Sequence, residues 1–141
     1  MNLWIFDTDH VSLWQTNHPT IRQRLLQTDP KTFAVTVISF EEQIRGRLGE
    51  INRITSETSL VPSYNNLQVT DAFFKNLNVL PYTTEAQALF KQLRKQRIRI
   101  GTRDLRIASI ALSLNSTIVT RNRRDFEQVP NLQIEDWTIL T

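Results

Sequence analysis

Leu3-Trp4-Ile5-Phe6-Asp7-Thr8-Asp9-His10 is the stretch of sequence that decides the fold class. Its first four residues are all apolar and lack the polar alternation of a half-exposed strand, which predicts a strand buried on both faces. Strands of this kind occur in parallel sheets that helices cover on both sides. The run ends at Asp7, so we expect an acidic side chain at the carboxyl end of a buried strand.

The remaining chain alternates between strand-like and helix-like segments. Four further β-branched or apolar runs predict strands over 33–38, 79–82, 117–120, and 132–134 with 137–140. Helical spacing predicts helices over 10–14, 20–26, 39–45 (extending as far as 54), 67–77, 84–93 and 105–114, with breaks at Pro62 and Gly101 and with Thr102 capping the last helix. The alternation predicts one three-layer α/β domain over residues 1–141, with a mostly parallel central sheet of about five strands flanked by helices.

Composition excludes several classes of protein. The 141 residues, 40% of them hydrophobic, are enough for one domain with a sizeable core. The absence of cysteine excludes a disulfide scaffold, a thiolate metal site and a cysteine nucleophile. No apolar run reaches the roughly 18 residues of a membrane span, and Asp7 and Asp9 interrupt the region where a signal peptide is apolar. We therefore expect a cytoplasmic protein without a membrane partner.

Arginine accounts for most of the positive charge. The chain has thirteen arginines and four lysines, and the guanidinium group is suited to two-point binding of phosphate. The basic residues gather in two groups: Lys91, Arg94, Lys95, Arg97, Arg99, Arg103 and Arg106; and Arg121, Arg123 and Arg124. We expect these arginines to form a rim that binds the phosphates of a nucleic acid, the alternative being an ordinary solvated surface.

Acidic residues follow the predicted strands. Asp7 and Asp9 follow the first strand and Glu41 and Glu42 the second; Asp104 begins the apolar helix before the fourth strand, and Asp125 comes after that strand. The carboxyl ends of parallel strands share one edge of a sheet, so these carboxylates are expected to converge there. Clustered carboxylates repel one another unless a cation neutralises them, and oxygen ligands suit Mg²⁺ or Mn²⁺.

Each acid also has a purely structural interpretation. Asp7 is a good helix cap, Ser39 and Glu42 have the spacing of a capping box, and Asp104 lies where a helix dipole favours an anion. Asp125 could be a solvated loop acid. His10 and His18 are interpreted as a helix-start residue and a surface residue, and Trp4, Trp14, Phe6, Phe73, Phe74 and Phe90 as core or interface residues.

Four segments together resemble the PIN domain, and more narrowly toxin ribonucleases of the VapC type. They are FDTDHVS (6–12), VISFEEQIRG (37–46), IGTRDLRIASIAL (100–112) and IVTRNRRDFEQVPNLQIEDW (118–137). The resemblance covers the chain from its first residues to Trp137, although 49–83 carries no motif. It implies that three of the metal-binding acids are Asp7, Glu42 and Asp104. Many members carry the fourth acid where this chain has Asn122, and others carry it at the dipeptide matched here by Asp125-Phe126; we place it on Asp125. The resemblance also implies supporting polar roles for Thr8, Asp9, Thr120 and Asn122.

The resemblance implies a Mg²⁺- or Mn²⁺-dependent endoribonuclease that a cognate antitoxin holds in check. It further implies a homodimer that contacts DNA only through the antitoxin. The predicted RNA-binding rim falls next to these acids, at Arg99, Arg103, Arg106, Arg121, Arg123 and Arg124. Two alternatives remain open at this point: a phosphatase of the haloacid-dehalogenase type that uses Asp7 and Asp9, and a non-catalytic RNA-binding α/β module.

Overall fold

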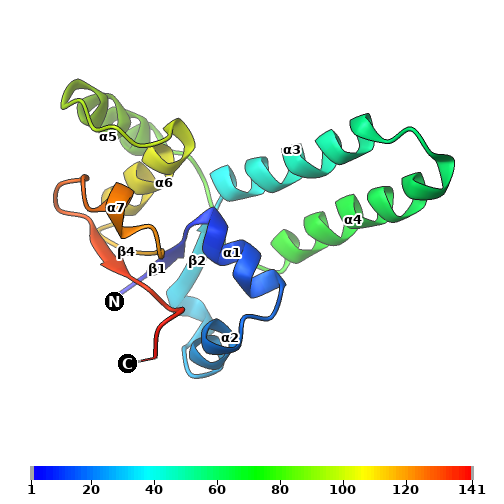
Figure 1. Ribbon diagram of the computed structural model, residues 1–141. Helices are drawn as coiled ribbons and strands as arrows, with labels where there is room; N and C mark the ends of the chain where they lie inside the picture. The colour runs from blue at the N-terminus through cyan, green and yellow to red at the C-terminus, as the bar shows by residue number, and fades with distance from the viewer. Residues whose placement is uncertain (1, 141) are drawn as a thin grey trace.

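A five-stranded parallel sheet forms the centre of the protein in a computed structural model that describes residues 2–140 (Figure 1). The strands are β1 (Trp4–Phe6), β2 (Phe33–Thr36), β3 (Val79–Leu80), β4 (Thr117–Val119) and β5 (Gln133–Glu135), in the order β3-β2-β1-β4-β5. The strand predicted from the opening sequence is the central one: Trp4 lies opposite Phe33 on one side and Thr117 on the other.

Helices cover both faces of the sheet, which gives the predicted three layers (Figure 1). They are α1 (Thr8–Gln15), α2 (Pro19–Leu26), α3 (Val37–Arg53), α4 (Glu57–Lys75), α5 (Thr84–Lys95), α6 (Thr102–Ser113) and α7 (Arg123–Phe126), with a short 3-10 helix at Pro30–Thr32. No helix within residues 2–140 combines the length and the apolar character that a membrane span requires.

Successive residues of the central strands supply two separate cores. Ile5 and Ile118 point to the face covered by α5 and α6, where the core is mainly aliphatic. Phe6 and Val119 point to the opposite face, where α1, α2 and α4 pack and Trp137 completes an aromatic cluster. Because a strand turns alternate side chains to opposite faces, an unbroken apolar run is what a sheet with two covered faces needs.

The start of α3 differs from the prediction. β2 ends at Thr36 instead of Ile38, and α3 begins at Val37. The Thr36 hydroxyl accepts the backbone N–H of Ser39 and caps the helix, so the predicted capping box between Ser39 and Glu42 is wrong. Val and Ile favour strands only weakly, and a capping threonine together with packing outweighs that preference.

Three further boundaries also differ. Pro62 does not end a helix but lies inside α4 as its sixth residue, where the missing N–H removes one helical hydrogen bond. Gly101 is the N-cap of α6, and Thr102 is the first residue of that helix instead of its cap. After β5 the chain forms no second strand segment over 137–140; Trp137 is instead buried in the aromatic core.

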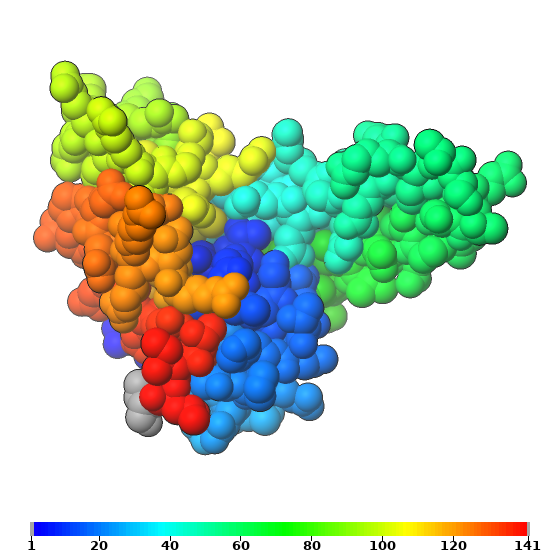
Figure 2. Space-filling view, viewed as in Figure 1, coloured from blue at the N-terminus to red at the C-terminus, as the bar shows by residue number. Residues whose placement is uncertain are grey.

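Helices α3 and α4 pack against one another as a hairpin that projects away from the sheet (Figures 1 and 2). This α3–α4 hairpin exposes four large apolar side chains, those of Leu48, Val61, Tyr64 and Val69. It includes most of the region for which the sequence offers no motif.

Candidate active site

Asp7 joins the central strand to its neighbour in the sheet. It is 4% exposed and caps α1 by accepting the His10 backbone N–H at 2.8 Å through Oδ1. Its other oxygen accepts the hydroxyl of Thr120, directly after β4, at 2.6 Å. The capping interpretation of Asp7 is therefore correct. Asp7 also lies directly after β1, at the carboxyl end of the strand where a site residue is expected.

An open cavity lies at the carboxyl ends of β1 and β4. The residues that line it come from α1, α3 and α6 and from the segments that directly follow β1 and β4: Asp7, Thr8, Asp9, Ser12, Glu42, Asp104, Arg121 and Asn122. The structure thus brings three of the four predicted acids, Asp7, Glu42 and Asp104, to the same cavity. Their catalytic roles stay a prediction at this point.

Glu42 is held by the first turn of a different helix. It lies in the second turn of α3, and its Oε1 accepts the Thr8 hydroxyl at 2.7 Å. The Thr8 hydroxyl also lies 2.9 Å from that of Ser39. Because Glu42 does not cap α3, its carboxylate is free of the backbone and turns toward α1 and the cavity.

Asp104 experiences the charges of all the other predicted acids. It lies in the first turn of α6, and its pKa is raised to about 6 by burial first and then by the negative charges of Asp7, Glu42 and Asp125. The repulsion is strong enough to be felt because burial weakens the screening by water. The effect of Asp7, Glu42 and Asp125 on the pKa of Asp104 indicates that the four acids form one group.

The pair Asn122 and Asp125 occupies the position that the sequence left ambiguous. Asn122 caps α7, and its Nδ2 donates to Asp125 Oδ2 at 3.0 Å. The Asn122 backbone N–H in turn donates to the Thr120 hydroxyl at 2.9 Å. Asn122 lines the cavity, whereas Asp125 does not line it and acts on Asp104 through its charge.

The arginines of the predicted basic rim divide into those that line a cavity beside the acids and those that do not. Arg121 lines the acidic cavity and binds both oxygens of Asp9, at 2.7 and 3.2 Å. Arg103 and Arg106 line an adjoining cavity that also contains Glu42 and Asp104. Arg123 instead pairs with Glu127 one turn along, at 3.7 Å, while Arg99 and Arg124 are exposed. Arg121, Arg103 and Arg106 are therefore the arginines that the fold places beside the acids.

His10 is fully buried, so its interpretation as a simple helix-start residue missed a contact with the site. Its Nε2 accepts the backbone N–H of Trp137 at 3.3 Å, and its Nδ1 lies 3.5 Å from Asp7 Oδ1. The signal that could have revealed it is the spacing of a histidine three residues after Asp7, on the inner face of α1. His18 caps α2 through Nδ1, which accepts the Ile21 N–H.

The donor set of the cavity suits a hard cation. Within residues 2–140, one group of acidic and histidine side chains brings ligand atoms within 4.8 Å of one another: Asp7, Asp9 and His10. However, His10 is buried with its Nε2 already engaged, and Asp9 is bound by Arg121. Asp7, Glu42 and Asp104, which line the same cavity, offer the carboxylate oxygens that Mg²⁺ and Mn²⁺ prefer as ligands.

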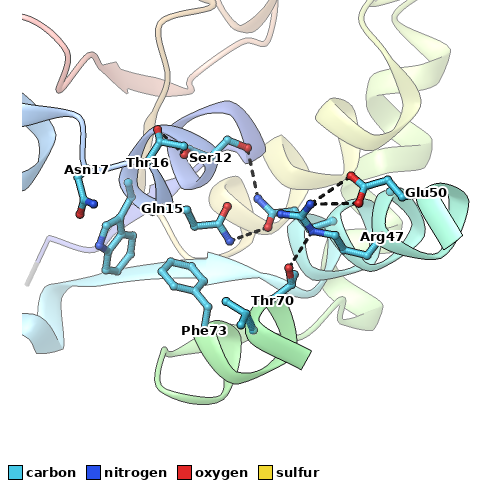
Figure 3. Close-up of a pocket in the computed structure, with 12 residues that line it drawn as sticks. Ser12, Gln15, Thr16, Asn17, Arg47, Glu50, Thr70 and Phe73 are labelled. Atoms are coloured by element: carbon cyan, nitrogen blue, oxygen red, sulfur yellow. Dashed lines mark hydrogen bonds and ion pairs between the residues drawn. The ribbon is translucent and has the colours of Figure 1, made fainter. Parts of the chain in front are cut away.

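A second groove runs beside the acidic cavity and shares Ser12 with it (Figure 3). It lies between α1 and the α3–α4 hairpin, and its polar side chains bind one another. Arg47 donates to Thr70 at 3.0 Å and to Glu50 at 3.1 Å, and Gln15 donates to Gln43 at 2.6 Å (Figure 3). This groove contains none of the predicted acids.

Curated proteins that are similar to this chain are VapC ribonucleases, although no protein-family model matches it. The tRNA(fMet)-specific endonuclease VapC of Salmonella typhimurium is 31% identical over 138 residues, which are 95% of this chain and 97% of that protein. Ribonuclease VapC1 of Haemophilus influenzae is 30% identical over 143 residues, which are 96% of this chain and 98% of that protein.

Solved structures agree with these relatives. The DNA-bound VapBC of Salmonella typhimurium contains a chain that matches with a TM-score of 0.79 at 30% identity, over 97% of this chain and 99% of that one. VapBC-1 of nontypeable Haemophilus influenzae matches with a TM-score of 0.76 at 26% identity, over 97% and 99%. These matches favour the ribonuclease hypothesis over the phosphatase and the non-catalytic module. With near-complete coverage in sequence and fold, the chain belongs to the VapC family of PIN-domain toxin ribonucleases.

Proposed function

We propose that this protein is an endoribonuclease that depends on Mg²⁺ or Mn²⁺ and hydrolyses phosphodiester bonds of RNA. The observation that carries the proposal is the convergence of Asp7, Glu42 and Asp104 on one cavity, where burial and the neighbouring negative charges raise the pKa of Asp104 to about 6. Carboxylates that a fold forces together against their repulsion are characteristic of sites that bind cations. The naming of its relatives as ribonucleases supports RNA as the substrate.

Asp7, Glu42 and Asp104 are the residues that would hold the metal at the cavity, with Asp125, which lies outside the cavity lining, as a fourth acid acting on Asp104 through its charge. A divalent ion bound there would neutralise their charge, generate a nucleophilic hydroxide from water and stabilise negative charge on the phosphate. Both oxygens of Asp7 already accept hydrogen bonds, from His10 and Thr120, which fix the direction of its free lone pairs.

The chain's other residues position the acids and the substrate. The Thr8 hydroxyl orients Glu42, and Asn122 orients Asp125. Arg103, Arg106 and Arg121 would bind phosphates on either side of the bond to be cut, since they line the two cavities that meet at Asp104 and Glu42. The guanidinium groups also counter the repulsion that carboxylates exert on an approaching RNA backbone.

We further propose that the protein is the toxin of a toxin–antitoxin pair and acts in the cytoplasm as a single domain over residues 1–141. The matching solved structures are VapBC complexes, one of them bound to DNA, which supports a cognate antitoxin as the partner. DNA contact would then be indirect, through the antitoxin. A homodimer remains the assembly that we expect from the family resemblance.

The decisive experiment compares two Glu→Gln variants in an RNA cleavage assay with Mg²⁺, with Mn²⁺ and with EDTA. Wild-type protein should cleave RNA with either ion and lose activity in EDTA. Glu42→Gln should be inactive although the amide oxygen still accepts the Thr8 hydroxyl. Glu57→Gln, an exposed residue in the first turn of α4, is the matched control and should cleave normally.

Two outcomes would contradict the proposal. Cleavage at the wild-type rate by Glu42→Gln would remove this carboxylate from the site. If wild-type protein bound RNA but cleaved it under none of the metal conditions, the non-catalytic RNA-binding module would be favoured instead.

A further inference from the structure

The backbone around Arg121 is fixed at the site, whereas the Arg121 side chain is half-exposed. Its two chain neighbours are fixed to the site, because the Thr120 hydroxyl donates to Asp7 and the Asn122 side chain binds Asp125. The backbone N–H of Asn122 also donates to the Thr120 hydroxyl, which closes the turn around Arg121. The root of the arginine side chain is therefore rigid at the edge of the acidic cavity.

The guanidinium of Arg121 has a single close partner, Asp9, within the described part of the chain. Nε lies 2.7 Å from one Asp9 oxygen and the terminal nitrogen 3.2 Å from the other. Hydrogen bonding and charge from Asp9, followed by the more distant charges of Asp136 and Asp7, raise the pKa of Arg121. The arginine is therefore oriented by the acidic side of the cavity.

The Arg121–Asp9 ion pair has short distances but contributes little free energy. The Arg121 side chain is 52% exposed and that of Asp9 44% exposed, so water competes for both charges. Exposed pairs of this kind typically change an equilibrium by no more than about fivefold. A phosphate, which also offers two oxygens to the planar guanidinium, can replace Asp9 at little cost.

We propose that Asp9 is a positioning residue that holds Arg121 over the cavity and is displaced from it by an RNA phosphate. This inference rests on the proposed function, because it assigns Arg121 to the RNA that the same site cleaves. Asp9 occupies the place of the phosphate while RNA is absent, which keeps the guanidinium beside the cavity that Arg121 lines. The same contact makes Asp9 a competitor that limits the affinity for RNA.

The test is a double-mutant cycle on RNA binding. Fluorescence anisotropy with a labelled oligouridine, in EDTA so that no cleavage occurs, should be measured for wild type, Asp9→Asn, Arg121→Ala and the double variant. Asp9→Asn should tighten binding by up to about fivefold, because the competitor is gone and the amide retains its place in the first turn of α1. In the Arg121→Ala background, Asp9→Asn should change affinity much less.

Asp71→Asn is the matched control for net charge. Asp71 is 41% exposed and forms its own ion pair with Lys75 at 2.9 Å, on α4 and outside the acidic cavity. The control should bind the oligouridine with nearly wild-type affinity. Equal tightening by Asp71→Asn and Asp9→Asn would overturn the inference, since bulk charge would then explain the effect.

Three other results separate this inference from the proposed function. Weaker or unchanged binding by Asp9→Asn would mean that RNA does not displace Asp9, even if the wild-type protein cleaves RNA. Tightening that persists in full after Arg121→Ala would overturn the inference by assigning the effect to direct repulsion between Asp9 and RNA. Failure of wild-type protein both to bind and to cleave RNA would overturn the proposed function, and the inference with it.

Discussion

The carboxyl edge of the sheet and the α3–α4 hairpin are built on opposite principles. At the edge, side chains from distant parts of the sequence bind one another: Thr120 and Asp7 are 113 positions apart, and Arg121 and Asp9 are 112 apart. In the hairpin, ion pairs join residues three or four positions apart, as in Arg47–Glu50 and Lys75–Asp71. The edge also brings together carboxylates that repel one another, whereas the hairpin mainly pairs opposite charges. We therefore expect function at the edge, where the fold holds carboxylates close together despite their mutual repulsion.

The largest contrast should appear when one carboxylate is neutralised in each region. We expect Asp7→Asn and Asp104→Asn to lose RNA cleavage by about 100-fold or more while remaining folded. Asparagine caps a helix as well as aspartate at position 7, and neutralising Asp104 relieves its repulsion by the neighbouring acids. Asp71→Asn should cleave at the wild-type rate. Initial cleavage rates with Mg²⁺, together with circular dichroism spectra, measure both properties. A wild-type rate in either of the first two variants would disprove the metal assignment.

Two buried threonines offer a sharper comparison. Thr120 is fully buried and donates to Asp7, while Thr70 is 3% exposed and joins Arg47 to α4 within the hairpin. Both Thr→Val changes remove one buried hydroxyl and should each cost about 1 kcal/mol of stability. Only Thr120→Val should also reduce cleavage, by about 10- to 100-fold, because it releases Asp7, a carboxylate that we propose as a metal ligand. Similar cleavage by both variants in single-turnover assays would show that the Thr120 contact is structural only.

Salt dependence separates arginines that bind RNA from those that serve the fold. Replacing Arg121, Arg123 and Arg124 together by Ala should reduce the log–log slope of RNA affinity against salt by about 0.7 for each phosphate that these arginines neutralise. Arg121 should account for most of this reduction, because among these three arginines it is the one that lines the acidic cavity.

Arg45→Ala combined with Arg53→Ala, both exposed on α3, is the control in the hairpin and should leave that slope unchanged. An unchanged slope in the triple variant would remove this cluster from the RNA site. Weaker binding of the antitoxin alone would move the cluster to the partner interface.

The smallest expected effect concerns stability and pH in the absence of metal. The pKa of Asp104 is raised from its ordinary value of 3.8 to about 6 on folding, so the folded protein binds its proton more tightly than the unfolded chain does. The stability that this difference contributes is therefore present in full below about pH 4 and disappears as pH rises to about 6 and above. Asp104→Asn should remove this fall, and Asp71→Asn should retain it. Urea unfolding between pH 4 and 8 with EDTA measures the difference.

The sequence predicted correctly those features in which the local residue pattern agrees with what the tertiary structure requires. The run Leu3–Phe6 predicted the central strand, and the acids after each strand predicted a shared edge, because both follow from the geometry of a parallel sheet. The start of α3 was misplaced because Val37 and Ile38 favour a strand, whereas the cap at Thr36 acts through one hydrogen bond. The partnership between His10 and Trp137 joins residues 127 positions apart, so no local pattern could reveal it.

The central place of β1 has a consequence for the timing of activity during synthesis. β1 emerges first from the ribosome, but its neighbour β4 begins at Thr117, and the Thr120 hydroxyl that orients Asp7 comes later still. Parallel pairing between such distant strands is slow, because the intervening chain must be ordered before the contact forms. A nascent chain shorter than this carries Asp7 and Glu42 without Thr120 or Asp125. The topology would thus delay assembly of the proposed nuclease site until β4 and the segment after it have been made.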